Sequence, residues 1–332
     1  MTMLRLPARL IATLLVLSLG AATAVASSLR PQDEFFAVNA RGSCCTTDPT
    51  QLEATLTVSQ LLPYDEQGCE RWMASHFDRL RESPGADTLT VIYVHGNQIT
   101  HQDALQRSLR VYRALVCQAD HDRPVRFILW SWPSSKVSGP INDFRVKALR
   151  TRPLGWQLAW GLDQMPTDSP ISLIGYSYGA RIIGGATHIL AGGDLSGLSL
   201  PERVHPTRPA MRVAFLAPAT HAQWFGQGQF HGLAMYQIDH LWMTVNPRDP
   251  AMRFYSWSST TSDPDAMGFR GPICLDSERR SRVTCCNVEN SVGRSHDLFD
   301  YVGSPRRMAS MWHHLSHPVG SELPTSESVA AH

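Results

Sequence analysis

Apolar runs alternate with segments of helical period from about residue 88 onward, which predicts strands followed by helices. The clearest run covers residues 88–94, and its continuous apolar character is typical of a parallel strand buried on both faces. Leu105, Leu109, Tyr112 and Leu115 then recur every three or four residues, which predicts a helix. Further strands are predicted at residues 126–131, 171–174, 211–216, 241–245 and 282–288. This alternation predicts an α/β domain, in which helices cover both faces of a mostly parallel sheet.

The chain on either side of this domain is less regular. Within residues 27–87 we predict a strand near 56–58 and a helix over 70–81, and we expect both to pack on the edge of the same sheet. Residues 318–332 offer little to bury and are expected to form a flexible tail. The α/β domain itself is therefore expected to span residues 88–317.

The first 26 residues have a composition of their own. Arg5 and Arg9 precede an apolar run over residues 10–19, and small residues then end in Ala24-Val25-Ala26. These three regions in this order are typical of a secretory signal peptide that is cleaved after Ala26. The apolar run is shorter than the roughly 20 residues that span a bilayer, so we expect no retained membrane anchor. The mature protein is expected to be secreted or periplasmic.

Composition and charge narrow the function classes. The chain has 332 residues, of which 43% are hydrophobic, and this is enough to build a core and excludes a disordered protein. Its 30 Lys and Arg residues against 29 Asp and Glu residues give a formal net charge of +1, with no basic block. Nucleic acid is therefore not an expected partner, since binding it requires clustered positive charge.

The cysteines fall into an early cluster and a late cluster, with one residue between them. In an oxidising compartment these clusters are expected to form disulfides, which we predict tie residues 27–87 to the late part of the chain. The pairing itself stays open. Neither cluster contains a C-x-x-C pair, so no metal site is expected. The early cluster is Cys44, Cys45 and Cys69, the late cluster is Cys274, Cys285 and Cys286, and Cys117 is expected to be a buried free thiol.

A G-x-S-x-G pattern stands where a predicted strand turns into a helix, at Gly175-Tyr176-Ser177-Tyr178-Gly179. The pattern alone is weak, but a strained strand-to-helix turn holds a serine hydroxyl above the sheet. A helix that begins just after Ser177 directs its first amides at the place where an oxyanion would form. Ser177 is therefore the predicted nucleophile, and the backbone N–H of Tyr178 is the first predicted oxyanion donor.

The loop after the first predicted strand contains a candidate for the second oxyanion donor. Asn97 is the predicted second donor, through its backbone N–H and with its side-chain amide as a further donor. His95 in the same loop is expected to hold the loop by hydrogen bonds rather than to ionise, with a place in the pocket as the alternative. Tyr176, Trp132 and His221 are the other candidate pocket residues.

A serine nucleophile needs a base, and the base needs a carboxylate that fixes its tautomer. In this architecture the chain order is serine, acid, histidine. Asp249 follows a predicted strand and is the predicted acid, although an Asp before Pro is also a common turn former. Asp263 and Asp265 are the reserve candidates. His296 follows the last predicted strand and is the predicted base.

These motifs together resemble the α/β-hydrolase superfamily, and within it a bacterial branch of unknown function. The resemblance covers roughly residues 88–300 and implies an α/β-hydrolase fold and a Ser/Asp/His hydrolase with Ser177, Asp249 and His296 in those roles. The chain departs from the branch at Tyr176-Ser177-Tyr178, where the branch commonly has His-Ser-Met, and at Ala219, where an acidic residue often stands. The shared features are Tyr93-Val-His-Gly-Asn97, Trp130-Ser-Trp-Pro-Ser134, the 175–179 elbow, Leu216-Ala-Pro218 and Asp249.

The expected function is therefore that of an exported serine hydrolase that cleaves carboxylic esters through an acyl-enzyme, with a small ester or acyl substrate and no cofactor. Amide or thioester hydrolysis is an open alternative, because the same chemistry serves all three bonds. A non-catalytic binding protein on a hydrolase scaffold is the alternative from another class. Residues 133–168, with Trp156 and Trp160, are expected to form either a cap over Ser177 or a crossover helix on the sheet.

Overall fold

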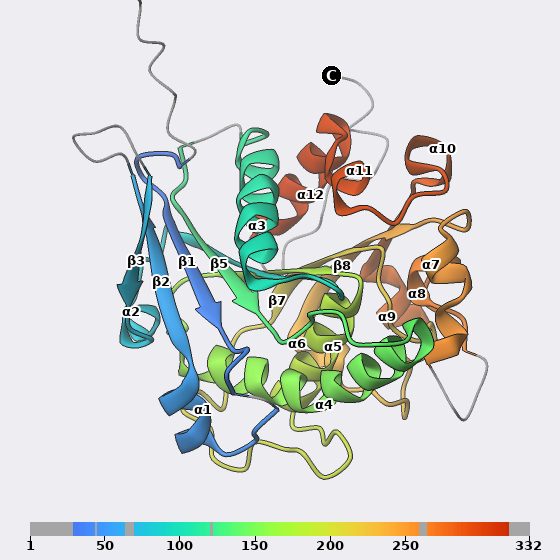
Figure 1. Cartoon of the computed structure of the whole chain (residues 1–332), viewed down its shortest axis with the longest axis horizontal. Helices are drawn as coiled ribbons and strands as arrows, with labels where there is room; N and C mark the ends of the chain where they lie inside the picture. Colours follow the sequence, from blue (N-terminus) through green and yellow to red (C-terminus); the bar gives the residue numbers. More distant parts are fainter. Residues whose placement is uncertain (1–28, 44, 64–69, 120–121, 259–263, 319–332) are drawn as a thin grey trace, which may run out of the picture.

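The computed structural model describes residues 29–43, 45–63, 70–119, 122–258 and 264–318 (Figure 1). Within these residues the chain forms a nine-stranded sheet in the order β3-β2-β1-β5-β4-β6-β7-β8-β9. β1 (Glu34–Asn39), β2 (Thr57–Leu62) and β3 (Arg71–Ser75) pair antiparallel with one another, and β1 pairs parallel with β5. The other strands, all parallel, are β4 (Leu89–Val94), β5 (Val125–Ser131), β6 (Ile171–Tyr176), β7 (Met211–Leu216), β8 (Ile238–Val245) and β9 (Val283–Asn287).

Helices cover both faces of the sheet (Figure 1). α3 (His101–Val116) and α12 (Pro305–Ser316) pack on one face, and α4 (Pro140–Gln164) and α5 (Tyr178–Leu190) pack on the other. This architecture confirms the predicted α/β-hydrolase fold. The short helices are α1 (Pro49–Thr55), α2 (Asp78–Arg81), α6 (Ala234–Gln237), α7 (Pro250–Arg253), α8 (Met267–Arg270), α9 (Ser277–Ser281), α10 (Glu289–Val292), α11 (Leu298–Val302) and a 3-10 turn at Tyr255–Ser258.

β4 shows how the sequence pattern produces the two-sided core. All six of its residues are buried, and successive side chains point to opposite faces. Ile92 and Val94 pack with the α4 and α5 side chains, whereas Val91 and Tyr93 pack with those of α3 and α12. The continuous apolar run thus serves two hydrophobic layers at once.

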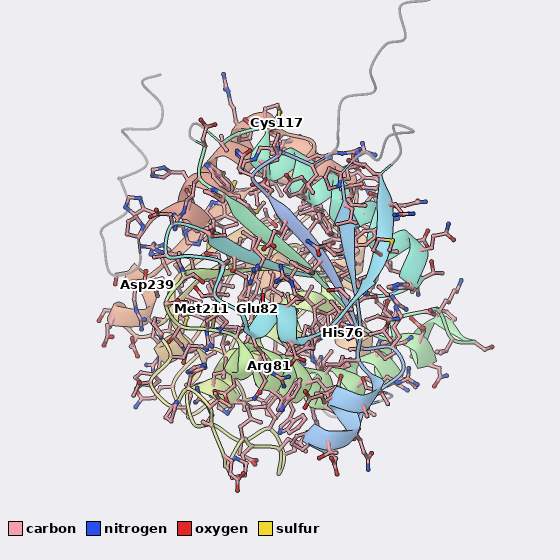
Figure 2. All side chains as sticks on the ribbon, turned by 90° about the vertical axis from the view of Figure 1, so that its left-hand side faces the viewer. His76, Arg81, Glu82, Cys117, Met211 and Asp239 are labelled. Atoms are coloured by element: carbon pink, nitrogen blue, oxygen red, sulfur yellow. The ribbon has the colours of Figure 1, made fainter. Side chains whose placement is uncertain are left out.

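α3 forms because its start is capped and one of its faces is apolar. Thr100 and Asp103 form a capping box, and Leu115 lies on the buried face. Cys117 comes two residues after Leu115, which is more than half a turn around the helix. Its side chain is therefore exposed at the end of α3 (Figure 2), and the prediction of a buried thiol is wrong.

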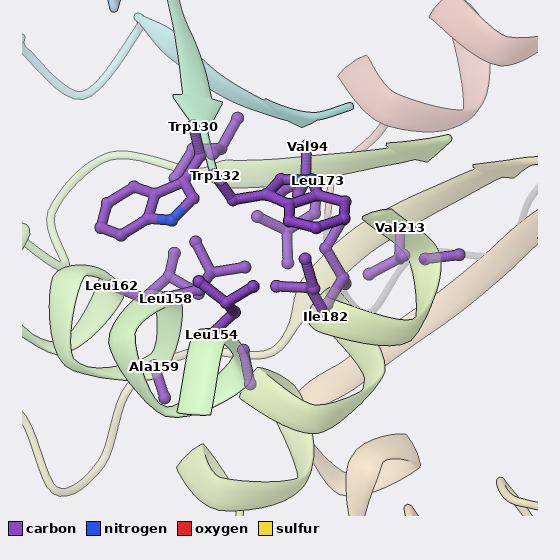
Figure 3. Packing of buried hydrophobic residues seen from close by; sticks show 14 of the residues in the cluster. Val94, Trp130, Trp132, Leu154, Leu158, Ala159, Leu162, Leu173, Ile182 and Val213 are labelled. Atoms are coloured by element: carbon purple, nitrogen blue, oxygen red, sulfur yellow. The ribbon is translucent and has the colours of Figure 1, made fainter. Parts of the chain in front are cut away.

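α4 occupies most of residues 133–168 and packs along α5 and the sheet. Leu154, Leu158 and Leu162 face Trp130 of β5 and Ile182 of α5 (Figure 3). The Trp156 indole N–H donates to the Ser199 carbonyl at 2.7 Å, and the Trp160 ring lies 5.4 Å from that of Phe77. Both tryptophans therefore belong to a crossover helix and not to a cap over Ser177, and of this stretch Phe144, near the start of α4, lines the cavity at Ser177.

The N-terminal segment extends the sheet through three strands. The predicted strand near 56–58 is present as β2, and β1 adds a strand that the sequence did not indicate. The predicted helix over 70–81 is wrong, because residues 71–75 form β3 and only Asp78–Arg81 are helical. Antiparallel pairing of β3 with β2 outweighs the local helical preference of this stretch.

The predicted disulfides between the early and late segments are wrong. Cys274, Cys285 and Cys286 form no disulfide, and Cys285 and Cys286 lie on β9, six strands away from β1 in the sheet. At about 4.8 Å per strand, β9 lies roughly 29 Å from β1 across the sheet. A disulfide, in contrast, joins Cα atoms that are roughly 6 Å apart. Cys44 and Cys69 lie outside the described residues.

Residues 1–26, the predicted signal peptide, also lie outside the described residues, as does the predicted tail from residue 319 onward. A search of the helices that are described finds none with the length and apolar character needed to cross a bilayer. The predicted site, in contrast, falls in described parts of the chain.

Candidate active site

Ser177 lies between β6 and α5 in a strained turn, with φ of 53° and ψ of −119°. A positive φ is costly for a residue with a side chain and persists only where neighbours hold it. Here the Ser177 N–H donates to the Leu216 carbonyl at 3.0 Å, and the Ser177 carbonyl accepts from the N–H groups of Ala180 and Ala219, each at 3.1 Å. The turn is thus fixed from both sides and holds the serine at the cavity.

The two glycines of the motif are required by close backbone approach. A Cβ on Gly175 would lie 2.7 Å from the Cα of Ala180, inside the same turn. A Cβ on Gly179 would lie 2.0 Å from the carbonyl oxygen of Val94 in β4. Any side chain at either position would push the elbow out of its place between β4 and α5.

The structure brings Ser177, His296 and Asp249 into one hydrogen-bonded chain. The Nε2 atom of His296 lies 3.1 Å from Ser177 Oγ, and its Nδ1 atom lies 2.7 Å from Asp249 Oδ2. A carboxylate only accepts, so Nδ1 carries the proton and Nε2 is free to accept from the serine. Of the reserve acids, Asp265 is partly exposed and ion-paired elsewhere, and Asp263 lies outside the described residues.

Asp249 is fully buried and is held by four donors. Its Oδ1 accepts from the backbone N–H groups of Ala251 and Met252 at 2.9 and 3.3 Å, because Asp249 is also the N-cap of α7. Its Oδ2 accepts from the Tyr301 hydroxyl at 2.9 Å as well as from His296. Burial and the nearby carboxylate raise the pKa of Tyr301 above its ordinary value, so Tyr301 remains a donor.

Tyr176, a predicted pocket residue, lies against the imidazole of His296. The two rings stack with centroids 5.5 Å apart, and the Tyr176 hydroxyl donates to the backbone carbonyl of His296. Burial raises the pKa of Tyr176 well above its ordinary value, which keeps the hydroxyl protonated as a donor. Tyr176 therefore both lines the cavity and fixes the loop that carries His296.

Asn97 and Tyr178, the predicted oxyanion donors, line the cavity together with Ser177. One of the two side-chain N–H donors of Asn97 is taken, because its Nδ2 donates to Asp143 Oδ2 at 2.6 Å. Among the described residues, no acceptor takes the backbone N–H of Asn97. The backbone N–H is therefore the better candidate for the second oxyanion donor, because the side chain is already directed at Asp143.

His95 is fully buried and holds the loop rather than lining the cavity. Its Nδ1 donates to the Gly96 carbonyl at 2.8 Å, and its Nε2 accepts from the Trp132 N–H at 3.2 Å. Burial and the charge of Arg41 lower the pKa of His95 to about 3, so the ring stays neutral. The Trp132 indole N–H donates to the His95 carbonyl at 2.7 Å. Neither His95 nor Trp132 lines the cavity at Ser177.

His221 also lies outside the cavity lining. Its ring packs 4.0 Å from that of Trp224 and 5.5 Å from that of Tyr255. Burial, with the charge of Arg181, lowers its pKa to about 3. His221 therefore supports Tyr255, which does line the cavity, and does not reach the predicted site itself.

The cavity at Ser177 has a volume of about 400 Å³. Apart from His296, none of its lining residues is acidic or basic. Across the described part of the chain, no three His, Cys, Asp or Glu side chains are grouped as metal ligands would be. The lining residues are Asn97, Gln98, Phe144, Tyr176, Ser177, Tyr178, Ala219, Pro250, Ala251, Met252, Phe254, Tyr255 and His296.

Sequence comparisons return no relative: neither a protein-family model nor a curated protein matches the chain. A comparison with solved structures finds similarity to the crystal structure of a C6-C4 SN3 inhibited esterase B from Lactobacillus rhamnosis. The two chains are 14% identical, and the match covers 78% of this chain and 77% of the esterase chain with a TM-score of 0.34.

Proposed function

We propose that this protein is an exported serine hydrolase that cleaves carboxylic esters through a covalent acyl-enzyme. The observation that carries the proposal is the chain of hydrogen bonds from Asp249 through His296 to Ser177, which ends at an open cavity. In the first step Ser177 Oγ attacks the ester carbonyl carbon while its proton passes to His296 Nε2. The imidazolium then gives this proton to the leaving alkoxide, and the acyl group stays on Ser177.

The second half of the reaction uses the same groups on water. His296 Nε2 takes a proton from a water molecule, the resulting hydroxide attacks the acyl carbon, and Ser177 Oγ leaves with the proton. In both steps the carbonyl oxygen becomes an oxyanion. The backbone N–H groups of Asn97 and Tyr178 are the proposed donors to it, and Tyr178 stands at the positive end of α5.

The cavity wall favours a neutral substrate with an apolar acyl or alcohol group. Phe144, Met252 and Phe254 provide apolar surface, and no Asp, Glu, Lys or Arg side chain lines the cavity to pair with an ionic group. An ionised substrate group would lose its hydration without gaining a partner, which is costly. Neutral esters are therefore the first substrates to assay, with the matching thioesters and amides beside them.

A fluorophosphonate should label the purified protein at Ser177 and at no other residue. Such probes react with a serine whose hydroxyl is activated by a base, and here His296 Nε2 is 3.1 Å from Ser177 Oγ. The adduct would be located by mass spectrometry of a digest. Ser177→Ala should abolish labelling, whereas Ser295→Ala, beside His296 but outside the hydrogen-bonded chain, should not.

The absence of an adduct on folded wild-type protein would contradict the proposal. In that case the non-catalytic binding protein becomes the better account of the same cavity. An adduct on a different serine would also contradict it, because Ser177 would then have no special reactivity.

The exported state is a further part of the proposal, supported by the three-part pattern of residues 1–26. Expression of the full chain in a bacterial host should yield a mature protein outside the cytoplasm whose N-terminal residue is Ser27. N-terminal sequencing of the purified protein checks this. Ala26→Lys should block cleavage, because the cleavage site needs small residues, whereas Thr23→Ser should not. Recovery of a cytoplasmic chain that still begins at Met1 would overturn the export proposal.

A further inference from the structure

Asp143 is a buried carboxylate in the first turn of α4 whose partners lie on the loop beside Ser177. Its Oδ2 accepts from Asn97 Nδ2 at 2.6 Å and from Gln98 Nε2 at 3.1 Å. Its Oδ1 accepts from the Val137 backbone N–H at 2.8 Å. One carboxylate thus binds two successive side chains of the cavity lining.

The charge of Asp143 is balanced by a second buried group. Lys147 lies one turn further along α4, with Nζ 3.8 Å from Asp143 Oδ1, and neither side chain is more than 1% exposed. The ammonium group also donates to the Ser135 carbonyl. A buried ion is tolerated only when it is paired and hydrogen-bonded, and this pair meets both conditions.

The contacts of Asp143 determine how the loop is held. Because a carboxylate only accepts, Asn97 must turn its NH₂ group toward Asp143, and its Oδ1 is buried with no partner among the described residues. Gln98 has a φ of +57°, which is costly for a residue with a side chain. Its backbone N–H donates to the Ser134 carbonyl at 2.8 Å, and its side chain is held by Asp143.

We propose that Asp143, paired with Lys147, is a positioning residue that fixes the backbone N–H of Asn97 for the oxyanion. This inference rests on the proposed function. An oxyanion donor stabilises the transition state only when it is held in place before the reaction, within about 0.5 Å. The loop has no regular secondary structure to hold it. Asp143 binds the side chain of Asn97, the residue that carries the N–H, and the side chain of the next residue, Gln98.

Asp143→Asn should lower kcat for a neutral ester by about 10- to 100-fold, with KM changed less than about threefold. The asparagine keeps the shape but has one acceptor oxygen instead of two, so it cannot accept from Asn97 and Gln98 on one side and from the Val137 N–H on the other, and it carries no charge to pair with Lys147. A trifluoromethyl ketone, which forms a tetrahedral adduct with serine, should lose affinity by the same factor as kcat. A non-reactive ester analogue should bind as before, since it does not require the oxyanion donors.

Asp163→Asn is the matched control, because Asp163 is a buried carboxylate at the other end of α4 that pairs with Arg203 at 2.8 Å. It should lower the melting temperature without changing kcat of the folded protein. Asn97→Ala removes the side chain that Asp143 holds and leaves the backbone N–H in the chain. It should lower kcat by a similar factor, and the double variant with Asp143→Asn should be little worse than either single variant.

The outcomes separate this inference from the function on which it rests. An unlabelled wild-type protein overturns the proposed function and this inference with it. A labelled wild type with unchanged kcat and ketone affinity in Asp143→Asn overturns only the role of Asp143. The role of Asp143 is also overturned if the losses of kcat in Asp143→Asn and Asn97→Ala add up in the double variant. It is overturned as well if Asp163→Asn loses as much kcat as Asp143→Asn. If Asp143→Asn does not fold, an Asn97→Ala variant with wild-type kcat overturns the role.

Discussion

Asp249→Asn should lower the turnover of an ester substrate by about 10⁴-fold. In the wild-type protein, the carboxylate accepts the Nδ1 proton of His296 at 2.7 Å and so leaves Nε2 unprotonated next to Ser177. An asparagine that turns its NH₂ group toward His296 makes Nδ1 the acceptor, and the proton then lies on Nε2. The imidazole can no longer take the proton of Ser177, although the site keeps its shape. The measurement is kcat, normalised to folded protein.

Tyr301→Phe is the matched comparison for this variant. It removes one hydrogen bond to Asp249 Oδ2, of 2.9 Å, but leaves the carboxylate and its contact with His296. Its loss of kcat should be about tenfold or less, because the tautomer of His296 is unchanged. An Asp249→Asn variant within tenfold of wild type would show that another acid orients His296.

Gly179→Ala should lower the free energy of unfolding by about 3 kcal/mol or more and remove labelling at Ser177. The added Cβ would lie 2.0 Å from the Val94 carbonyl oxygen. Val94 belongs to β4, which is hydrogen-bonded to β5 on one side and to β6 on the other. The Val94 carbonyl therefore cannot move away from the added methyl group without breaking these pairings. α5 must therefore shift, and Ser177 at its start shifts with it. Urea denaturation and fluorophosphonate labelling measure the two effects.

Gly155→Ala provides the control, because it also adds one methyl group to a buried helical glycine. At Gly155 the nearest atom would be 3.4 Å away, an ordinary contact distance. Its free energy of unfolding should stay within about 1 kcal/mol of wild type, since alanine is also the better helix former. Equal stability of the Gly179→Ala and Gly155→Ala variants would show that α5 can move without cost.

The fold and three of the site residues could be predicted because their signals are local. Buried parallel strands are continuous apolar runs, and loops that follow parallel strands meet at one edge of a sheet. Ser177, Asp249 and His296 each follow such a strand, so a pattern of strand ends was sufficient to predict that they lie together. Their catalytic roles stay predictions until the variants are assayed.

Asp143 and Tyr301 could not be found in this way. An Asp in the first turn of a helix is common, because its charge interacts favourably with the helix dipole, so its presence does not indicate a functional role. Nothing near Asp143 in the sequence shows that its carboxylate meets Asn97, 46 residues earlier, or that Tyr301 meets Asp249, 52 residues earlier. The error over the cysteines on β9 has a similar cause, since local patterns do not give the order of strands in a sheet.

The position of His296 in the chain also sets when the serine can become reactive. The turn at Ser177 is held by β4 and β7, which both precede His296 in the chain, whereas His296 follows β9, the last strand of the described sheet along the chain. A folding chain whose last segment has not yet docked on the sheet can therefore have the elbow while the Ser177 hydroxyl has no base. In the proposed mechanism, the protein stays latent until His296 reaches Ser177, and reactivity at Ser177 reports the end of folding.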